Sequence, residues 1–154
     1  SERLQIVEAV LLDYKAIAAM IVARASGRVA EEAGRILGAV ARAVKESKLH
    51  AGIVTIFCPG STGGLTTIEF EDGVVHDLRQ VLDEITPPDR AYRHHLRWHD
   101  DNGHSHIRAA LIGPSLTVPI VSSELTLGTW QQIVFCDFDT SPRSRTLILQ
   151  MMSE

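Results

Sequence analysis

Apolar residues recur at spacings of three and four along the first 25 residues of the chain. The stripe consists of Leu4, Val7, Leu11, Tyr14, Ala18, Ile21 and Ala25. This spacing places side chains on one face of an α-helix, so it predicts a helix that ends near Ser26-Gly27. A second stripe predicts another helix over roughly residues 28–47, with Val29, Ala33, Ile36, Val40 and Val44 as its members. The two together predict an N-terminal helical hairpin over residues 1–50.

Short apolar runs rich in β-branched residues replace the helical spacing after residue 51. Such runs are typical of strands, and they lie at residues 52–58, 65–70, 115–121, 125–139 and 145–152. The pattern also predicts a helix over residues 74–85 and a shorter one over 105–112, with Asn102 near its start. Residues 51–154 are therefore expected to form an α+β domain that follows the hairpin.

Composition places a boundary at the same point in the chain. Of the 15 Ala, 12 lie in residues 1–51, whereas all 10 Thr, all six Pro and all four Phe follow. The net charge of −4 argues against nucleic-acid binding. The chain has neither the apolar run of about 20 residues that spans a membrane nor the order of a signal peptide. We therefore expect a cytoplasmic protein that binds neither nucleic acid nor membrane, with Cys58 and Cys136 as reduced core residues.

Histidine is concentrated in YRHHLRWHDDNGHSHIRA, residues 92–109. Five of the seven histidines lie there, namely His94, His95, His99, His104 and His106. Neutral imidazole binds transition metals and titrates near neutral pH, so the cluster suggests a metal site or an acid–base site, and a solvated loop is the alternative. In a helix the side chains of His104 and His106 would diverge by about 200°. At most two or three of the five can therefore meet at one ion.

Other segments offer groups that suit an anion. PGSTGG (59–64) exposes backbone N–H groups and the hydroxyls of Ser61 and Thr62, although a plain turn between strands is the alternative. Arg143 and Arg145 share a face at the start of the last strand, where they suit phosphate or carboxylate unless they are simply a solvated edge. Glu69 is either a surface residue or a site residue.

The segment LGTWQQ (127–132) offers a stacking face on Trp130 and an amide on Gln131. A tryptophan in the core is the usual explanation for such a residue. The sequence alone leaves both interpretations of this segment open.

These segments occur together and in this order in the YjbQ-like proteins, which the chain resembles over roughly residues 36–152. The shared motifs are PGSTGGLTTIE, YRH, NGHSH, GPSLTVP, LGTWQ and PRSR. The resemblance implies a compact α+β fold with a mixed, barrel-like sheet, a homotrimer, and pockets lined by His that can hold Zn or Mg. It also implies a thiamine-phosphate synthase side activity, which joins an aminopyrimidine diphosphate to a thiazole phosphate and releases pyrophosphate.

The resemblance assigns roles to single residues. His94 in Y-x-H and His106 in N-x-x-x-H become the candidate metal ligands, with His104 as a substitute. The candidate catalytic residues are Glu69, Ser61 and Thr62. The candidate ligands of the anionic substrate are Ser61, Thr62, Trp130, Gln131, Arg143 and Arg145.

Two departures from the family pattern qualify these expectations. Gly60 stands where many members have a His, which weakens the expectation of a bound divalent metal. Residues 1–35 have no counterpart in the resemblance, so they are either natural divergence or an engineered helical addition. The alternative function is a trimeric building block, natural or engineered, whose N-terminal helices form a second interface in a cage or scaffold.

Overall fold

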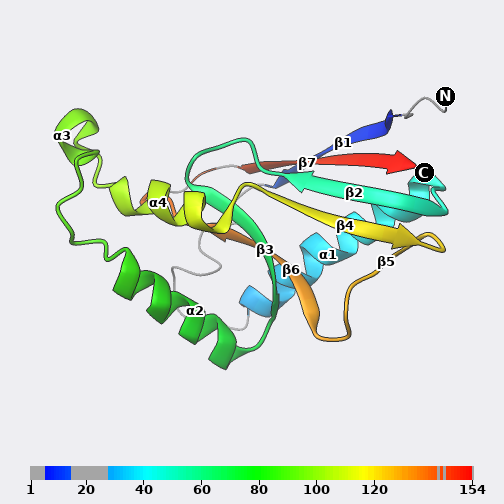
Figure 1. The fold of residues 1–154 in the computed structure, drawn as a ribbon, viewed down its shortest axis with the longest axis horizontal. Coiled ribbons are helices and arrows are strands. Elements are labelled where there is room, and N and C mark those ends of the chain that lie inside the picture. Colours follow the sequence, from blue (N-terminus) through cyan, green and yellow to red (C-terminus); the bar gives the residue numbers. More distant parts are fainter. Residues whose placement is uncertain (1–5, 15–27, 142, 144, 154) are drawn as a thin grey trace.

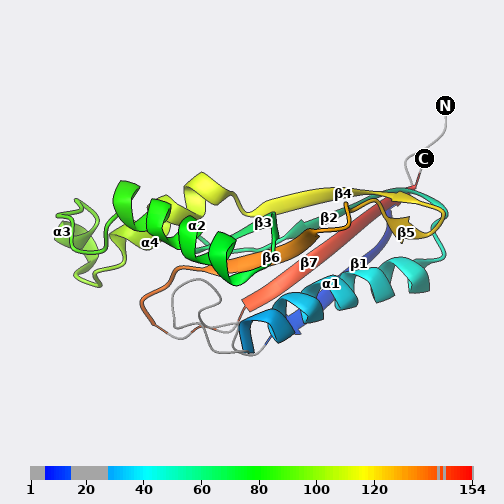
Figure 2. The same cartoon turned by 90° about the horizontal axis from the view of Figure 1, so that it is seen from below.

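The computed structural model describes residues 6–14, 28–141, 143 and 145–153, and Figures 1 and 2 show it from two sides. The helices are α1 (Arg28–Ser47), α2 (Asp72–Ile85), α3 (His95–Trp98) and α4 (Gly103–Ile112). The strands are β1 (Ile6–Tyr14), β2 (Ala51–Phe57), β3 (Gly63–Glu69), β4 (Ser115–Val121), β5 (Glu124–Leu125), β6 (Gln131–Asp137) and β7 (Arg145–Ser153).

The strands form two groups. A five-stranded sheet has the order β1-β7-β2-β4-β5, and β3 and β6 form a two-stranded ribbon. The strands curl around one side, which α1 covers, while α2, α3 and α4 lie toward one end (Figures 1 and 2). An α+β fold with a curled, barrel-like sheet and flanking helices is therefore confirmed. Every strand pair in the described residues is antiparallel, however, rather than mixed in direction as expected.

The first helix of the predicted hairpin is wrong over Ile6–Tyr14, because these residues form strand β1. The backbone of β1 pairs with β7, and Val10 lies opposite Leu149. A short, nearly continuous apolar run such as IVEAVLLDY cannot be assigned to helix or strand by its pattern alone, so the distant pairing partner decides its conformation. The remainder of the predicted helix, at residues 4–5 and 15–25, lies outside the described residues.

The second helix of the predicted hairpin is confirmed as α1, which lies along one face of the strands (Figure 2). Ile36, Val40 and Val44 are four residues apart and fully buried. They belong to the same apolar cluster as Leu147 and Leu149 of β7. Burying each such side chain contributes about 1.5–3 kcal/mol, so this layer adds substantially to the stability of the fold.

The other elements lie close to their predicted positions, with one exception and one addition. The apolar run at 125–139 is not a single strand, because residues 126–130 separate β5 from β6. At this interruption the backbone N–H of Gly128 donates to the side-chain oxygen of Gln131 at 2.8 Å. The short helix α3 is the addition. Its four residues are too few to show a periodic apolar pattern, so the sequence did not predict it.

Cys58 and Cys136 are free and buried, as predicted. Burial raises the pKa of the Cys136 thiol to about 12, because a thiolate loses its hydration in an apolar environment. Both cysteines are therefore part of the core. Among the described residues, no helix combines the length and the apolar character needed to cross a membrane.

Arg108 joins α4 to the end of α2. Its buried guanidinium donates to the backbone oxygen of Thr86 at 2.7 Å and forms a 2.7 Å ion pair with Asp83. A cation here balances the carbonyl groups that a helix leaves unpaired at its C-terminus. This contact fixes the position of α4, and with it the position of His106.

Candidate functional site

Three segments that are far apart in the sequence line one open cleft of about 520 Å³. They are the loop before β3, the connection through α3 to α4, and the segment that leads into β7. The lining residues are Gly60, Ser61, Thr62, His94, Trp98, Asp100, Asn102, His106, Asp139, Arg143 and Arg145. Six of these are predicted site residues, so the fold brings together most of the groups that the sequence singled out.

His94 and His106 meet on one side of the cleft. Their ring centroids are 4.4 Å apart, and the rings are inclined by 47°. Nε2 of His94 lies 3.4 Å from a carboxylate oxygen of Asp100. Desolvation opposes ionisation of Asp100, but the backbone N–H of Asn102 and the neighbouring His94 lower the pKa of this carboxyl group. The imidazole pair therefore has an ionised carboxylate beside it.

Arg145, in the wall of the cleft, forms a buried ion pair. Its Nε and Nη2 donate to the two carboxylate oxygens of Asp137 at 3.0 and 2.7 Å. Nη2 also donates to the hydroxyl of Thr62 at 2.8 Å. The hydrogen bonds that Arg145 donates to Asp137 raise the pKa of Arg145 against the opposing effect of desolvation. The bidentate geometry fixes the guanidinium in one orientation.

Asp139 links the loop before β3 to the segment that leads into β7. Its Oδ2 accepts from the hydroxyl of Thr62 at 2.9 Å and lies 3.1 Å from Nε of Arg143. Burial alone would raise the pKa of Asp139, but donors from Ser141, Thr62 and Arg143 lower it to about 2. Asp139 is therefore ionised throughout the physiological pH range.

These contacts decide which groups remain for a ligand. The hydroxyl of Thr62 already donates to Asp139 and accepts from Arg145. Ser61 is exposed, and the terminal amino groups of Arg143 have no partner among the described residues. Ser61 and Arg143 are therefore the best placed to bind an anion, whereas Thr62 has a structural role in the loop.

Glu69, Trp130 and Gln131 lie away from this cleft. Glu69 is at the far end of β3, opposite Gln131 of β6. With about 3.3 Å per residue of strand, the seven residues of β3 put it on the order of 20 Å from Thr62. Trp130 is exposed in the loop before β6. The structure does not bring these three predicted site residues to the others.

Gln131 lines a second, smaller cavity of about 360 Å³. Apolar side chains of Leu37, Leu125 and Leu127 form part of its wall, between α1 and the loop that precedes β6. The cavity contains none of the predicted metal or anion ligands other than Gln131.

His104 is buried behind the cleft rather than in its lining. Its ring centroid lies 6.4 Å from that of Tyr92. Desolvation lowers the pKa of His104, and the positive charge of Arg108 and the neighbouring His95 lower it further. We therefore expect a neutral His104 at neutral pH. The fold does not place it among the cleft residues as a substitute ligand.

The donors in the cleft form only part of a metal site. His94 and His106 supply two imidazoles. Nε2 of His94 is buried, and because its 3.4 Å approach to Asp100 lacks hydrogen-bond geometry, it has no hydrogen-bond partner among the described residues. Within those residues, no group of three or more His, Cys, Asp or Glu side chains is arranged to hold an ion. The donors that the described residues of a single chain supply therefore do not fit a tightly bound divalent metal. Metal binding stays a prediction.

Sequence reasoning missed four residues of the site and its support. Trp98 and Asp100 lie in the histidine-rich segment but attracted no role, because neither belongs to a recognisable motif. Asp137 and Asp139 follow the buried run VFC at the end of β6. Acidic residues directly after a buried strand are a signal that could have indicated a polar site at this end of the ribbon.

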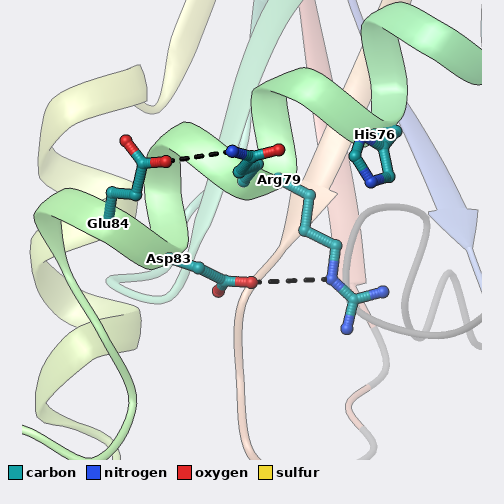
Figure 3. Close-up of a pocket in the computed structure, with 5 residues that line it drawn as sticks. His76, Arg79, Asp83 and Glu84 are labelled. Carbon is teal, nitrogen blue, oxygen red and sulfur yellow. Dashed lines mark hydrogen bonds and ion pairs between the residues drawn. The ribbon is translucent and has the colours of Figure 1, made fainter.

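A further cavity of about 540 Å³ lies on the outer face of α2. Its side chains pair along the helix, Arg79 with Asp83 (Figure 3) and Gln80 with Glu84. Such pairs at spacing i, i+4 are typical of a solvated helix surface. This face therefore provides no convergent site.

Comparison with known proteins gives one consistent match. The family model described as UPF0047 protein YjbQ-like covers residues 25–154. A UPF0047 protein of Archaeoglobus fulgidus is 36% identical over 101 residues, which are 66% of this chain and 78% of that protein. The UPF0047 protein YugU of Bacillus subtilis is 34% identical over 110 residues, with 71% and 80% covered.

Solved structures extend the match to the N-terminal region. A YbjQ-like protein of unknown function from Sulfolobus solfataricus has a TM-score of 0.72 and 33% identity, and the match covers 77% of this chain and 85% of that one. A hypothetical protein from Aeropyrum pernix has a TM-score of 0.76 and 27% identity, with 96% and 99% covered. The family model, which starts at residue 25, and this match to 96% of the chain both reach into residues 1–35, for which the sequence alone predicted no counterpart.

Proposed function

The chain belongs to the UPF0047 family of YjbQ-like proteins, and from this premise we propose that its cleft binds a phosphorylated small molecule and has a thiamine-phosphate synthase side activity. The observation that carries the proposal is the convergence of Ser61, Arg143 and the His94–His106 pair on one cleft. Hydroxyl, guanidinium and imidazole groups together are suited to phosphate oxygens.

The proposed reaction makes limited demands on the protein. The C–O bond between the aminopyrimidine methylene and its diphosphate breaks, and its electron pair leaves with pyrophosphate. The ring nitrogen of the thiazole phosphate forms the new C–N bond. Stabilising the charge that develops on the leaving diphosphate is the main contribution a protein can make. The terminal amino groups of Arg143 and the hydroxyl of Ser61 are suited to this, and no role is proposed for Glu69.

The test is formation of thiamine phosphate by the purified protein. We expect Arg143→Ala and His106→Ala to lower the rate by about 100-fold, the effect of removing one group that stabilises charge in a transition state. Arg79→Ala, which removes an exposed arginine of α2, is the control and should leave the rate unchanged. If the wild-type protein and both cleft variants give the background rate, the proposed activity is wrong.

Metal binding by His94 and His106 is tested separately. Because one described chain supplies an incomplete ligand set, we expect weak binding of Zn²⁺ that His94→Ala and His106→Ala each abolish. His99→Ala, which changes an exposed histidine outside the cleft lining, is the control. Metal analysis after dialysis and titration calorimetry with Zn²⁺ give the measurement. Unchanged Zn²⁺ binding in both cleft variants would contradict this site.

A further inference from the structure

Asp139 connects the polar groups of the cleft although its own side chain is only 4% exposed. Its Oδ2 accepts from Thr62 at 2.9 Å and lies 3.1 Å from Nε of Arg143. Its Oδ1 accepts the backbone N–H of Ser141 at 3.0 Å. Both carboxylate oxygens are therefore used within the protein, which leaves Asp139 little capacity to bind a ligand itself.

The contact with Arg143 has a geometric consequence. A guanidinium group is planar, so a partner that fixes Nε also fixes the plane of the two terminal amino groups. Arg143 is half exposed and lines the cleft. The neighbouring Arg145 is already held by Asp137 and Thr62, so the orientation of Arg143 is the one that a ligand would depend on.

We propose that Asp139 is a positioning residue, which holds Arg143 so that its two terminal amino groups face the cleft and can bind two oxygens of a phosphate or diphosphate. The ligand class rests on the proposed function. The positioning itself rests on the contacts of Asp139 with Arg143 and Thr62.

The positioning role and simple electrostatics predict opposite changes in anion binding when the charge of Asp139 is removed. Removing a negative charge from an anion site should strengthen anion binding, because one repulsive interaction is lost. If Asp139 acts by positioning Arg143, its removal should weaken binding instead. Asp139→Asn is the suitable change, because the single amide oxygen cannot serve both Ser141 and the pair formed by Thr62 and Arg143.

The experiment measures binding of inorganic pyrophosphate by titration calorimetry. We expect Asp139→Asn to weaken binding by about tenfold in the wild-type background, comparable to the loss of one charge-assisted hydrogen bond. In an Arg143→Ala background the same change should leave binding unchanged or strengthen it. Asp77→Asn, which removes an exposed carboxylate outside the cleft lining, controls for net charge. Thermal unfolding of each variant confirms that it is folded.

A second measurement does not depend on any ligand. The Nε–H of Arg143 should give a slowly exchanging ¹⁵N NMR signal in the wild-type protein and lose this protection in Asp139→Asn. If this signal is protected but pyrophosphate does not bind, the positioning stands and the proposed function is wrong.

Three results would overturn the positioning role. One is an unprotected Arg143 Nε–H in the wild-type protein. Another is unchanged or stronger pyrophosphate binding by Asp139→Asn. The third is an equal loss of binding with and without Arg143, which would indicate a general effect on the loop through Thr62.

Discussion

The polar residues of the cleft divide into those whose hydrogen-bonding capacity is used within the protein and those with capacity left for a ligand. A threonine hydroxyl has one proton to donate, and that of Thr62 is directed to Asp139. Ser61, its neighbour in the loop, is exposed. The sequence predicted that both belong to the site, since residue type and loop composition are local properties. It could not distinguish their roles, because the partners of Thr62 come from residues more than 70 positions away.

The buried pair of Asp137 and Arg145 should be important for stability. Asp137→Asn removes the charge that compensates Arg145, whose side chain is 9% exposed. Breaking a buried ion pair by removing one partner costs about 3–5 kcal/mol, so the free energy of unfolding in urea should fall by at least about 2 kcal/mol. Arg79→Ala breaks an exposed pair on α2 and should cost less than about 1 kcal/mol. Equal losses for the two variants would contradict the structural role of Arg145.

Asp139 should also make the protein sensitive to acid. Its pKa of about 2 in the folded protein is below its ordinary value of 3.8. A carboxyl group with a lowered pKa stabilises the folded state fully above pH 3.8, and this contribution is lost as the pH falls toward 2. In Asp139→Asn the free energy of unfolding should therefore decline less steeply between about pH 4 and 2.

Urea unfolding at several pH values measures this slope, with Asp77→Asn as the matched variant. If Asp139→Asn and Asp77→Asn reduce the slope of the unfolding free energy against pH by the same amount, Asp139 makes no special contribution to acid sensitivity. The comparison within one pH series removes the general effect of changing net charge.

Helices and strands were predictable from the sequence where a local pattern determines them. Helix α1 and strand β4 lie where their apolar patterns indicate. Strand β1 could not be recognised, because its conformation depends on backbone pairing with β7 at the other end of the chain. For a similar reason Glu69 belongs to a site motif in sequence but lies at the opposite end of β3 from Thr62, since a strand separates its two ends.

Strands β2 and β7 approach closely at a glycine. Gly52 has φ +151°, and a Cβ atom there would lie 2.0 Å from the backbone oxygen of Met152. Gly52→Ala must therefore displace the backbone of one of the two strands, which should cost about 2 kcal/mol or more. Gly38→Ala in α1, where a Cβ atom would lie 3.6 Å from the nearest atom, should be neutral or slightly stabilising.

Thermal unfolding of the two glycine variants measures this difference. Hydrogen exchange should locate the weakened region of Gly52→Ala at the β2–β7 pair rather than at α1. Similar melting temperatures for Gly52→Ala and the wild-type protein would mean that the two strands tolerate a wider separation at this point.

Helices α3 and α4, which lie toward one end of the molecule (Figure 1), carry four exposed apolar side chains, here called the α3–α4 surface. Its members are Leu96, Trp98, Ile107 and Leu111, which are between 45% and 78% exposed. Large contiguous patches of such side chains mark protein–protein contacts, so a partner contact at these four residues is a testable prediction. Trp98 also lines the cleft, so a partner on this surface would border the candidate site.

For the whole molecule, the family resemblance predicts a homotrimer. A chain of 16.9 kDa should then give a mass of about 51 kDa by size-exclusion chromatography with light scattering. The double variant Leu96→Ser, Leu111→Ser should lower this mass if the α3–α4 surface forms the contact, whereas Val121→Ser changes an equally exposed residue of β4 and should not. A larger discrete mass would instead support the building-block function. A monomeric wild-type protein would contradict both, and pyrophosphate binding by the cleft would then have to be achieved by one chain alone.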